Sequence, residues 1–180
     1  MNKLIIRLAT VLLMVFFGGA MSVVTGVEAA GPVITLKSNK QVYTPGSGLT
    51  VFVSVANDTQ ARVVDCYVVL VIPGNSWFCL TSQGLIPVNP NRLDTFLPLL
   101  NGLQLSAGYQ LNDFPLLAYN FPVDGKTYEG FYTVLTAFTK PGQKVLDGIP
   151  GSVTFTYTSE LPPPPPGGQK PFDPASGTQD

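Results

Sequence analysis

Aromatic side chains are the residues of this sequence best suited to bind a ligand. Trp77 follows a Pro-Gly-Asn-Ser turn, and Tyr109, Tyr119 and Tyr128 lie in or beside a loosely patterned region, residues 83–122. Exposed rings at such positions stack on sugar faces or anchor protein interfaces. The alternative, which we favour for Trp77, is that the ring packs against its own domain, because tryptophan is highly buried on average.

The ionisable residues form no catalytic or metal-binding pattern. The chain has no histidine, so the commonest general base and the usual metal ligand are missing, and two cysteines alone do not complete a zinc site. The carboxylates are scattered singly, without the spacing of a calcium loop or an evident pair for glycosidic chemistry. We expect solvated turn acids at Asp58, Asp65, Asp94, Asp113, Asp124, Glu129 and Asp147. We therefore predict no catalytic, cofactor-binding or metal-binding residues, and an enzyme is the least favoured class.

Residues 1–29 have the three-part layout of a secretory signal peptide. Lys3 and Arg7 precede a nearly uncharged apolar run from Leu8 to Val27, which ends in small residues. A retained transmembrane anchor is the alternative, since about 20 apolar residues span a bilayer. A glycine pair inside the run and the small residues at its end favour cleavage. We expect an exported protein, periplasmic, cell-surface or extracellular, with no membrane span after cleavage.

The remaining chain is weakly charged. Loss of the first 29 residues leaves 8 of the 10 basic and 10 of the 11 acidic residues, a formal charge of −2. Charged residues are 12% of the whole chain, against roughly a quarter in an average soluble domain. No basic patch is present to neutralise phosphates or an anionic membrane. We expect no nucleic-acid partner, and an unidentified envelope protein or glycan is the expected kind of partner.

Cys66 and Cys79 are the only cysteines. In an oxidising compartment they are a possible disulfide, and a bridge that closes so short a loop would add on the order of 3 kcal/mol to the stability of the fold. A hairpin centred on the turn at residues 73–76 would not place them directly opposite each other. Two separate buried thiols are the alternative, and the bridge is only slightly favoured.

Short alternating segments separated by turn residues fill the middle of the chain. In residues 49–56, leucine and valine alternate with more polar residues, as in a strand packed on one face. Residues 61–72 become apolar on both faces and therefore indicate a central strand. In residues 151–159, Val, Phe and Tyr alternate with outward threonines. About seven such strands with no helical period predict an all-β fold, a two-sheet antiparallel sandwich.

Two regions depart from this pattern. Between residues 83 and 122, four prolines interrupt any long helix, and we expect edge strands and long loops there: Pro87, Pro90, Pro98 and Pro115. After Glu160 the composition changes to a run of five prolines and polar residues. That segment has too little apolar content to fold and favours an extended chain. We assign residues 30–159 to one domain and residues 160–180 to a disordered Pro-rich tail.

The stretch "NKQVYTPGSGLTVFVSVAN" resembles the K-x-x-Y-x-P-G opening of immunoglobulin-like domains in bacterial exported proteins, and also that of macroglobulin-type domains. "VDCYVVLVIPGNSWFCL" is similar to their V-D-V-Y-x-x-L-x-x-P-D-G strand and turn, with Cys66 replacing an aliphatic residue and Gly74-Asn75 replacing Asp-Gly. "EGFYTVLTAFTKPG" is similar to their late G-x-Y-T strand. These blocks lie within residues 34–158, and the resemblance implies an immunoglobulin-like sandwich without catalytic residues.

The tyrosine and turn of the opening motif have a structural interpretation. Pro45 fixes φ, and Gly46 can adopt the positive φ that a type II turn requires. Tyr43 can pack at the edge of the sandwich while its hydroxyl bonds a backbone group, as in a tyrosine corner.

Three function classes remain from the sequence. The first is a non-catalytic exported immunoglobulin-like binding or interaction module of the bacterial cell envelope. The second is a self-assembling surface or structural subunit, a homo-oligomer that pairs through a free edge strand. The third is a carbohydrate-binding module that uses the aromatic residues named above.

Overall fold

The computed structural model describes residues 31–124 and 127–160. The predicted signal peptide, residues 1–29, lies outside the described residues, and so does the Pro-rich tail after Glu160. Within the described part, no helix is long and apolar enough to cross a membrane.

The described chain is built from ten β-strands and one short 3-10 helix, with no α-helix among its residues. This confirms the all-β prediction. The elements, in order, are β1 (Val33–Ser38), β2 (Val42–Tyr43), β3 (Gly48–Ala56), β4 (Arg62–Ile72), β5 (Ser76–Thr81), β6 (Gly84–Val88), η1 (Leu93–Thr95), β7 (Leu100–Leu105), β8 (Gln110–Asn120), β9 (Gly130–Thr139) and β10 (Gly151–Tyr157).

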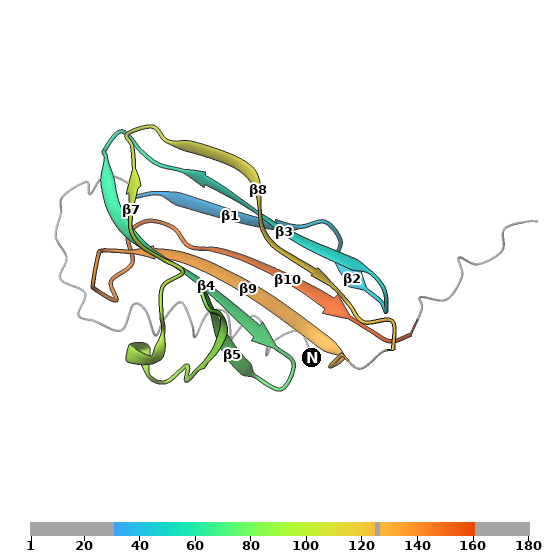
Figure 1. Ribbon diagram of the computed structural model, residues 1–180. Coiled ribbons are helices and arrows are strands. Elements are labelled where there is room, and N and C mark those ends of the chain that lie inside the picture. The colour runs from blue at the N-terminus through green and yellow to red at the C-terminus, as the bar shows by residue number, and fades with distance from the viewer. Residues whose placement is uncertain (1–30, 125–126, 161–180) are drawn as a thin grey trace, which may run out of the picture.

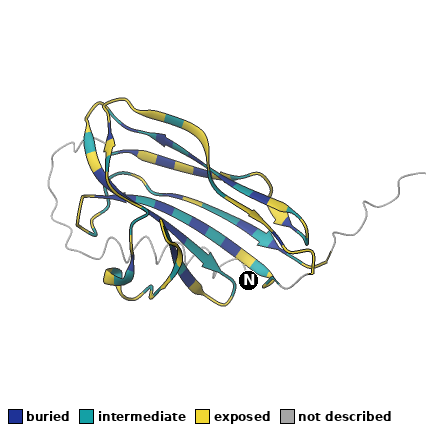
Figure 2. Ribbon diagram, in the orientation of Figure 1, coloured by how far each residue is buried: buried dark blue, intermediate teal, exposed yellow. Residues whose placement is uncertain are grey.

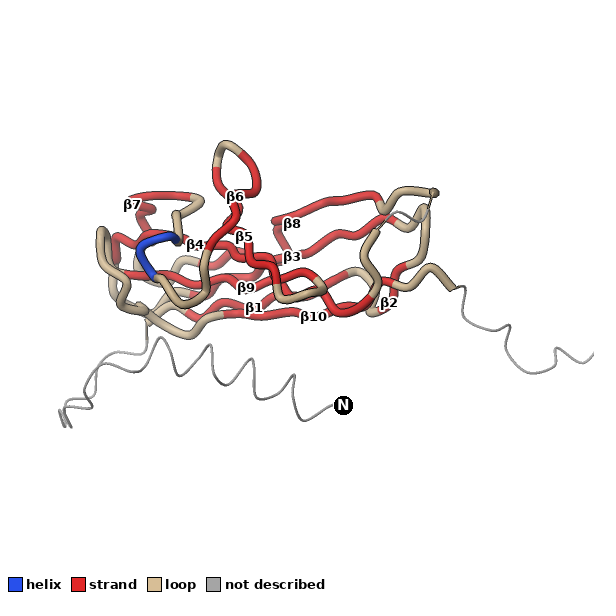
Figure 3. Tube along the Cα trace, turned by 90° about the horizontal axis from the view of Figure 1, so that it is seen from below, coloured by secondary structure: helices blue, strands red, loops and turns tan. Residues whose placement is uncertain are grey.

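The strands form two sheets (Figure 1). The smaller sheet has the order β1-β3-β8, and the larger one has the order β2-β10-β9-β4-β5-β6, with β7 paired to the first half of β4. All strand pairs are antiparallel except the two-residue pair of β2 with β10. Figure 3 shows η1 at the end of the molecule where β7 lies.

The main core lies between the two sheets and follows the predicted alternation. Leu49, Val51, Val53 and Val55 of β3 are all buried, whereas the residues between them are only partly buried. The same alternation is visible along β1 and β9 in Figure 2. Period-two patterning therefore determined which side of each strand faces the other sheet.

β4 is the central strand of the larger sheet, as its two apolar faces predict. It lies between β9 on one side and β5 with β7 on the other. Val64, Cys66 and Val68 point into the main core. Tyr67 and Val69 point the other way and form a second buried cluster on the outer face of the larger sheet with Trp77, Cys79 and Phe96. The larger sheet is thus apolar on both faces.

Residues 83–122 contain the expected edge strands. β6 is the last strand of the larger sheet, and β8 is an edge of the smaller one. Each carries one proline, Pro87 and Pro115 respectively, which is the usual place for proline in a sheet. β8 has two register shifts against β3, and Asp113 beside one of them has φ of 49°. Its eleven residues form a longer strand than the proline-rich sequence indicated.

The opening motif forms the predicted turn. Ser47 N–H donates to the carbonyl oxygen of Thr44 at 2.9 Å, and Gly46 has φ of 78°, as a type II turn requires. The ring of Tyr43 is fully buried. Its hydroxyl accepts from Lys40 N–H at 3.0 Å and donates to Asn39 Oδ1 at 2.7 Å. Tyr43, Pro45 and Gly46 therefore have the structural role that the sequence indicated.

An aromatic cluster closes the core at this end of the sandwich. The Tyr43 ring centroid lies 5.2 Å from that of Phe155, in an edge-to-face arrangement. Phe121 stacks on Tyr157 at 4.7 Å, and Tyr132 stacks on Phe155 at 5.6 Å. Each such pair contributes about 0.5–1.5 kcal/mol beyond its buried area. The cluster therefore joins β2, β9, β10 and the end of β8 into one packed unit.

The slightly favoured Cys66–Cys79 disulfide is wrong for this structure, in which both thiols are free. Cys66 belongs to the core between the sheets, and Cys79 belongs to the cluster on the outer face. Cys79 is directly opposite Val69 on β4, three residues from Cys66. Because successive side chains of a strand alternate between its faces, the two sulfur atoms point to opposite sides of one sheet.

We expect Tyr43→Phe to lower the free energy of unfolding by about 1–2 kcal/mol, because it leaves the Lys40 N–H without its acceptor. Guanidinium unfolding would measure this. Tyr128→Phe is the matched control, since Tyr128 is 73% exposed, and should change stability by less than about 0.5 kcal/mol. Equal effects of the two substitutions would contradict the assigned role of Tyr43.

Thiol titration tests the cysteine geometry. Burial raises the pKa of the Cys66 thiol to about 11 and also raises that of Cys79, so both react slowly in the folded protein, because the thiolate is the reactive form. We expect two thiols per chain after unfolding without reductant, and little reaction before it. A count of zero thiols in denaturant would show that Cys66 and Cys79 form a disulfide and would overturn their placement on opposite faces of the sheet.

Candidate functional site

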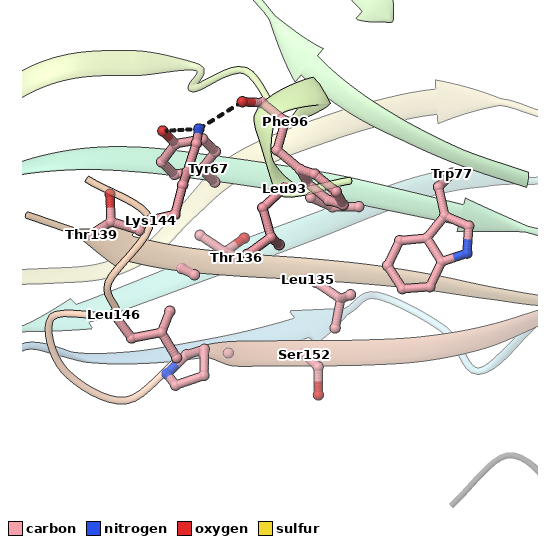
Figure 4. Close-up of a pocket in the computed structure, with 14 residues that line it drawn as sticks. Tyr67, Trp77, Leu93, Phe96, Leu135, Thr136, Thr139, Lys144, Leu146 and Ser152 are labelled. Atoms are coloured by element: carbon pink, nitrogen blue, oxygen red, sulfur yellow. Dashed lines mark hydrogen bonds between the residues drawn. The ribbon is translucent and has the colours of Figure 1, made fainter. Parts of the chain in front are cut away.

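An apolar pocket lies on the outer face of the larger sheet (Figure 4). It has a volume of about 140 Å³ and is open to solvent on one side. Side chains from β4, β5 and β9 form its floor, and η1 with the loop at residues 140–150 forms its walls. The pocket therefore lies where two connecting segments cover the sheet incompletely.

The floor consists of outward-facing residues of three adjacent strands. Tyr67 and Val69 come from β4, Trp77 from β5, and Leu135 and Ala137 from β9. Ala137 is directly opposite Tyr67, and Leu135 is directly opposite Val69. A small side chain beside a large one leaves a hollow in the sheet surface, and this pairing places the alanine in the floor of the pocket.

The wall formed by η1 brings apolar side chains down onto the sheet. The 3-10 turn places Leu93 at the pocket, and Phe96, which follows it, is 4% exposed. The turn is closed by Thr95, whose Oγ1 donates to the Arg92 carbonyl at 2.7 Å and accepts from Asn89 N–H at 3.1 Å. These local bonds hold Phe96 against Tyr67 and Trp77 in the outer cluster.

Lys144 is the charged residue of the pocket wall. Its Nζ donates to Tyr67 Oη and to the Phe96 carbonyl oxygen, both at 2.8 Å, and lies 4.4 Å from the centroid of the Tyr67 ring. The side chain is partly buried. Among the described residues, no carboxylate lies within 4.0 Å of this ammonium group. The main partner of Asp94 is Arg92, at 2.6 Å, and their hydrogen bond is the main cause of the lowered pKa of the Asp94 carboxyl. The charge of Lys144 lowers this pKa further.

Asp65 positions the loop that carries Lys144. This carboxylate is 4% exposed. Its Oδ1 accepts from Gly102 N–H and its Oδ2 from Gly142 N–H, both at 2.8 Å. It thereby joins the central strand β4 to β7 and to the start of the loop. The sequence-based expectation of a solvated turn acid is wrong for Asp65, because it lies within β4 rather than in a turn.

The far end of the loop is held in two further ways. Arg62 Nη1 donates to Asp147 Oδ1 at 2.9 Å, and Arg62 Nη2 donates to Asp58 Oδ2 at 2.8 Å. Gly148 has φ of 97°, and a Cβ at this position would collide with the carbonyl oxygen of Pro32. The loop is therefore fixed on both sides of Lys144. Asp58 and Asp147 thus also have structural partners.

The four aromatic residues singled out from the sequence do not form one site. Trp77 is 7% exposed and packs on its own sheet, and it also lines the pocket. Tyr109, 36% exposed, directly precedes β8, and Tyr119, 47% exposed, lies within β8 near its end. Tyr128 precedes β9 and is 73% exposed. None of these three tyrosines lines the pocket.

Sequence reasoning did not identify Tyr67, Phe96, Ala137 and Lys144 as pocket residues. One signal was present for Tyr67, because a strand that is apolar on both faces needs cover on both. Nothing in the local sequence showed that η1 and the loop at 140–150, about fifty residues apart, would meet over that strand. Among the described residues, no group of three or more histidine, cysteine or acidic residues is arranged to hold a metal ion.

Comparison with known proteins gives no family. The chain matches no protein-family model and no curated protein sequence. Solved structures with some likeness include the Pseudomonas fluorescens alkylpurine DNA glycosylase AlkC, bound to DNA containing an abasic site analog, at 15% identity and a TM-score of 0.42. The sporulation control protein Spo0M from Bacillus subtilis has 15% identity and a TM-score of 0.36. The CARDB domain of the PF1109 protein from Pyrococcus furiosus, in complex with di-metal ions, has 13% identity and a TM-score of 0.37.

Each alignment covers 71% of this chain. It covers 30% of the AlkC chain, 49% of the Spo0M chain and 87% of the CARDB domain chain. This chain therefore spans less than half the length of the first two proteins. At this identity and TM-score, none of the three supports an argument about function.

Asp65→Asn tests the anchor of the loop. Asparagine has one acceptor oxygen in place of two, so one of the Gly102 and Gly142 N–H groups loses its partner. We expect the free energy of unfolding to fall by about 1–2 kcal/mol in a urea titration. Asp94→Asn is the matched control, because the Asp94 side chain is 66% exposed, and it should cost less than about 0.5 kcal/mol. Unchanged stability in Asp65→Asn would show that the anchor contributes nothing.

Proposed function

We propose that this protein is a non-catalytic, exported binding module with an immunoglobulin-like sandwich, and that the pocket beside Trp77 is its binding site. The observation that carries the proposal is the incomplete cover over the outer face of the larger sheet. Apolar side chains there form a preformed hollow with one charged group at its wall, the usual composition of a small-molecule site.

The size of the pocket limits what enters it. An apolar cavity of about 150 Å³ is large enough to bind benzene, and this pocket has about 140 Å³. Pockets for drug-sized ligands are larger, about 300–1,000 Å³. The part of the ligand inside the pocket is therefore one aromatic ring or a short aliphatic chain.

Export and the immunoglobulin-like class rest on sequence features. The basic start, apolar run and small-residue end of residues 1–29 support export. The turn at Pro45 and Gly46 forms as these two residue types predict, and two mainly antiparallel sheets with a shared core are compatible with an immunoglobulin-like domain. In a bacterial envelope, such a module would meet small molecules outside the cytoplasm.

Two features favour a small-molecule pocket over carbohydrate binding and over self-assembly. A sugar-binding face needs exposed rings side by side, whereas Trp77 is buried and Tyr109, Tyr119 and Tyr128 lie elsewhere. Assembly through β6 or β8 is disfavoured by Pro87 in β6 and by Pro115 and the bulges in β8, which are features that natural sheets use to prevent edge pairing.

Trp77 allows a direct binding test, because it is the only tryptophan and lines the pocket. We expect 3-phenylpropionamide, a neutral one-ring compound, to change its fluorescence saturably with a dissociation constant of about 0.1–1 mM, given the few atoms that it buries. Ala137→Phe should abolish the change, because the new ring fills the pocket.

Ala118→Phe is the matched control on β8, outside the pocket, and should bind like the unaltered protein. Far-ultraviolet circular dichroism would verify that both variants keep their strands. Binding that persists in Ala137→Phe would refute the pocket as the binding site.

A further inference from the structure

We infer that the ligand of this pocket is an amphiphilic carboxylate, a small molecule whose apolar body lies in the pocket and whose carboxylate is bound by Lys144. This inference rests on the proposed function and adds the chemical class of the ligand. It depends on the position, hydrogen bonds and surroundings of the Lys144 ammonium group.

The Lys144 ammonium has one donor left for a ligand. A lysine ammonium has three N–H donors, and Tyr67 Oη and the Phe96 carbonyl oxygen accept two of them. Among the described residues, no third acceptor lies within hydrogen-bond distance. Lys144 is part of the pocket lining, so a ligand in the pocket lies beside this side chain.

Among the described residues, Lys144 forms no ion pair, and Asp94, which is paired with Arg92, acts on its charge only at longer range. Both of its hydrogen-bond partners are uncharged oxygens, and the described ion pairs involve Lys37, Arg62 and Arg92 instead. Partial burial removes water from an ammonium group at a cost that an opposite charge offsets. An anion bound in the pocket supplies that opposite charge, whereas a cation meets repulsion and a neutral ligand gains a hydrogen bond without the attraction between opposite charges.

The geometry of the site holds the ammonium in place before a ligand arrives. Asp65 and Asp147 anchor the loop on the two sides of Lys144. The Tyr67 hydroxyl and the Phe96 carbonyl then fix the end of the side chain. Little conformational entropy remains to be lost on binding, which favours affinity for a ligand of matching charge.

The rest of the lining selects the body of the ligand. Val69, Trp77 and Leu135 provide apolar surface across the floor, and Leu146 provides it beside the loop. A small hydrophilic anion such as phosphate or acetate would leave this surface in contact with water. The site therefore favours an apolar carboxylate over an inorganic anion.

Three probes of the same shape test the inference through Trp77 fluorescence: 3-phenylpropionate, 3-phenylpropionamide and 3-phenylpropylamine. We expect the carboxylate to bind about tenfold more tightly than the amide, and the amine more weakly than the amide. The preference should shrink in high salt, since screening weakens the attraction between opposite charges. Acetate alone should cause no change.

Variants assign the preference to one residue. Lys144→Met should bind the carboxylate and the amide with similar affinity and so lose the tenfold preference, and Lys144→Arg should retain most of it. Lys140→Met is the matched control, because Lys140 is exposed in the same loop and does not line the pocket. It should behave like the unaltered protein.

The outcomes separate the inference from the proposed function. Equal affinity for carboxylate and amide in the unaltered protein would overturn the inference and leave the pocket as a neutral apolar site. Failure of all three probes would overturn both. A carboxylate preference that persists in Lys144→Met would place the anion elsewhere and also overturn the inference. If Lys144→Met lost amide binding too, two other results would test the inference. A carboxylate preference that shrinks in high salt and persists in Lys144→Arg would support it, and a preference that does neither would overturn it.

Discussion

The need to cover β4 on both faces is the constraint on which the rest of this structure depends. Its inward residues are buried by the smaller sheet, and its outward residues Tyr67 and Val69 need a second cover. No second sheet supplies that cover among the described residues. Two connecting segments, η1 and the loop at 140–150, pack there instead, and because loops cover less surface than a sheet, a hollow remains.

Polar groups hold this irregular cover in place. A buried carboxylate on β4, Asp65, accepts from the backbone of β7 and of the loop at 140–150, and Lys144 of that loop donates a hydrogen bond to Tyr67 on β4. These bonds are charge-assisted, and those to Gly142 and from Lys144 tie the loop, which has few backbone partners of its own, to β4. The same bonds that order the loop place an ammonium group at the pocket, so stability and the candidate site share their residues.

Prediction from the sequence succeeded where a pattern was local and failed where it was not. The alternation in residues 49–55 correctly identified the buried side of β3, and the Pro45-Gly46 pair correctly identified a type II turn. The disulfide was wrong because the relative position of Cys66 and Cys79 depends on the register of β4 with β5. Tyr109, Tyr119 and Tyr128 lie apart from the pocket, and a binding role for them stays a prediction.

The sequence by itself determined the all-β class, the inward faces of the strands and the turn after Tyr43, because each depends on the conformational preferences and polarity of neighbouring residues. It also showed that β4 is apolar on both faces. Only the tertiary structure decided what covers the outer face, that Asp65 is an anchor rather than a turn acid, and that Lys144 lies beside Tyr67. Those relations join segments dozens of residues apart, and they depend on how the strands pair and how the loops pack, which local pattern does not encode.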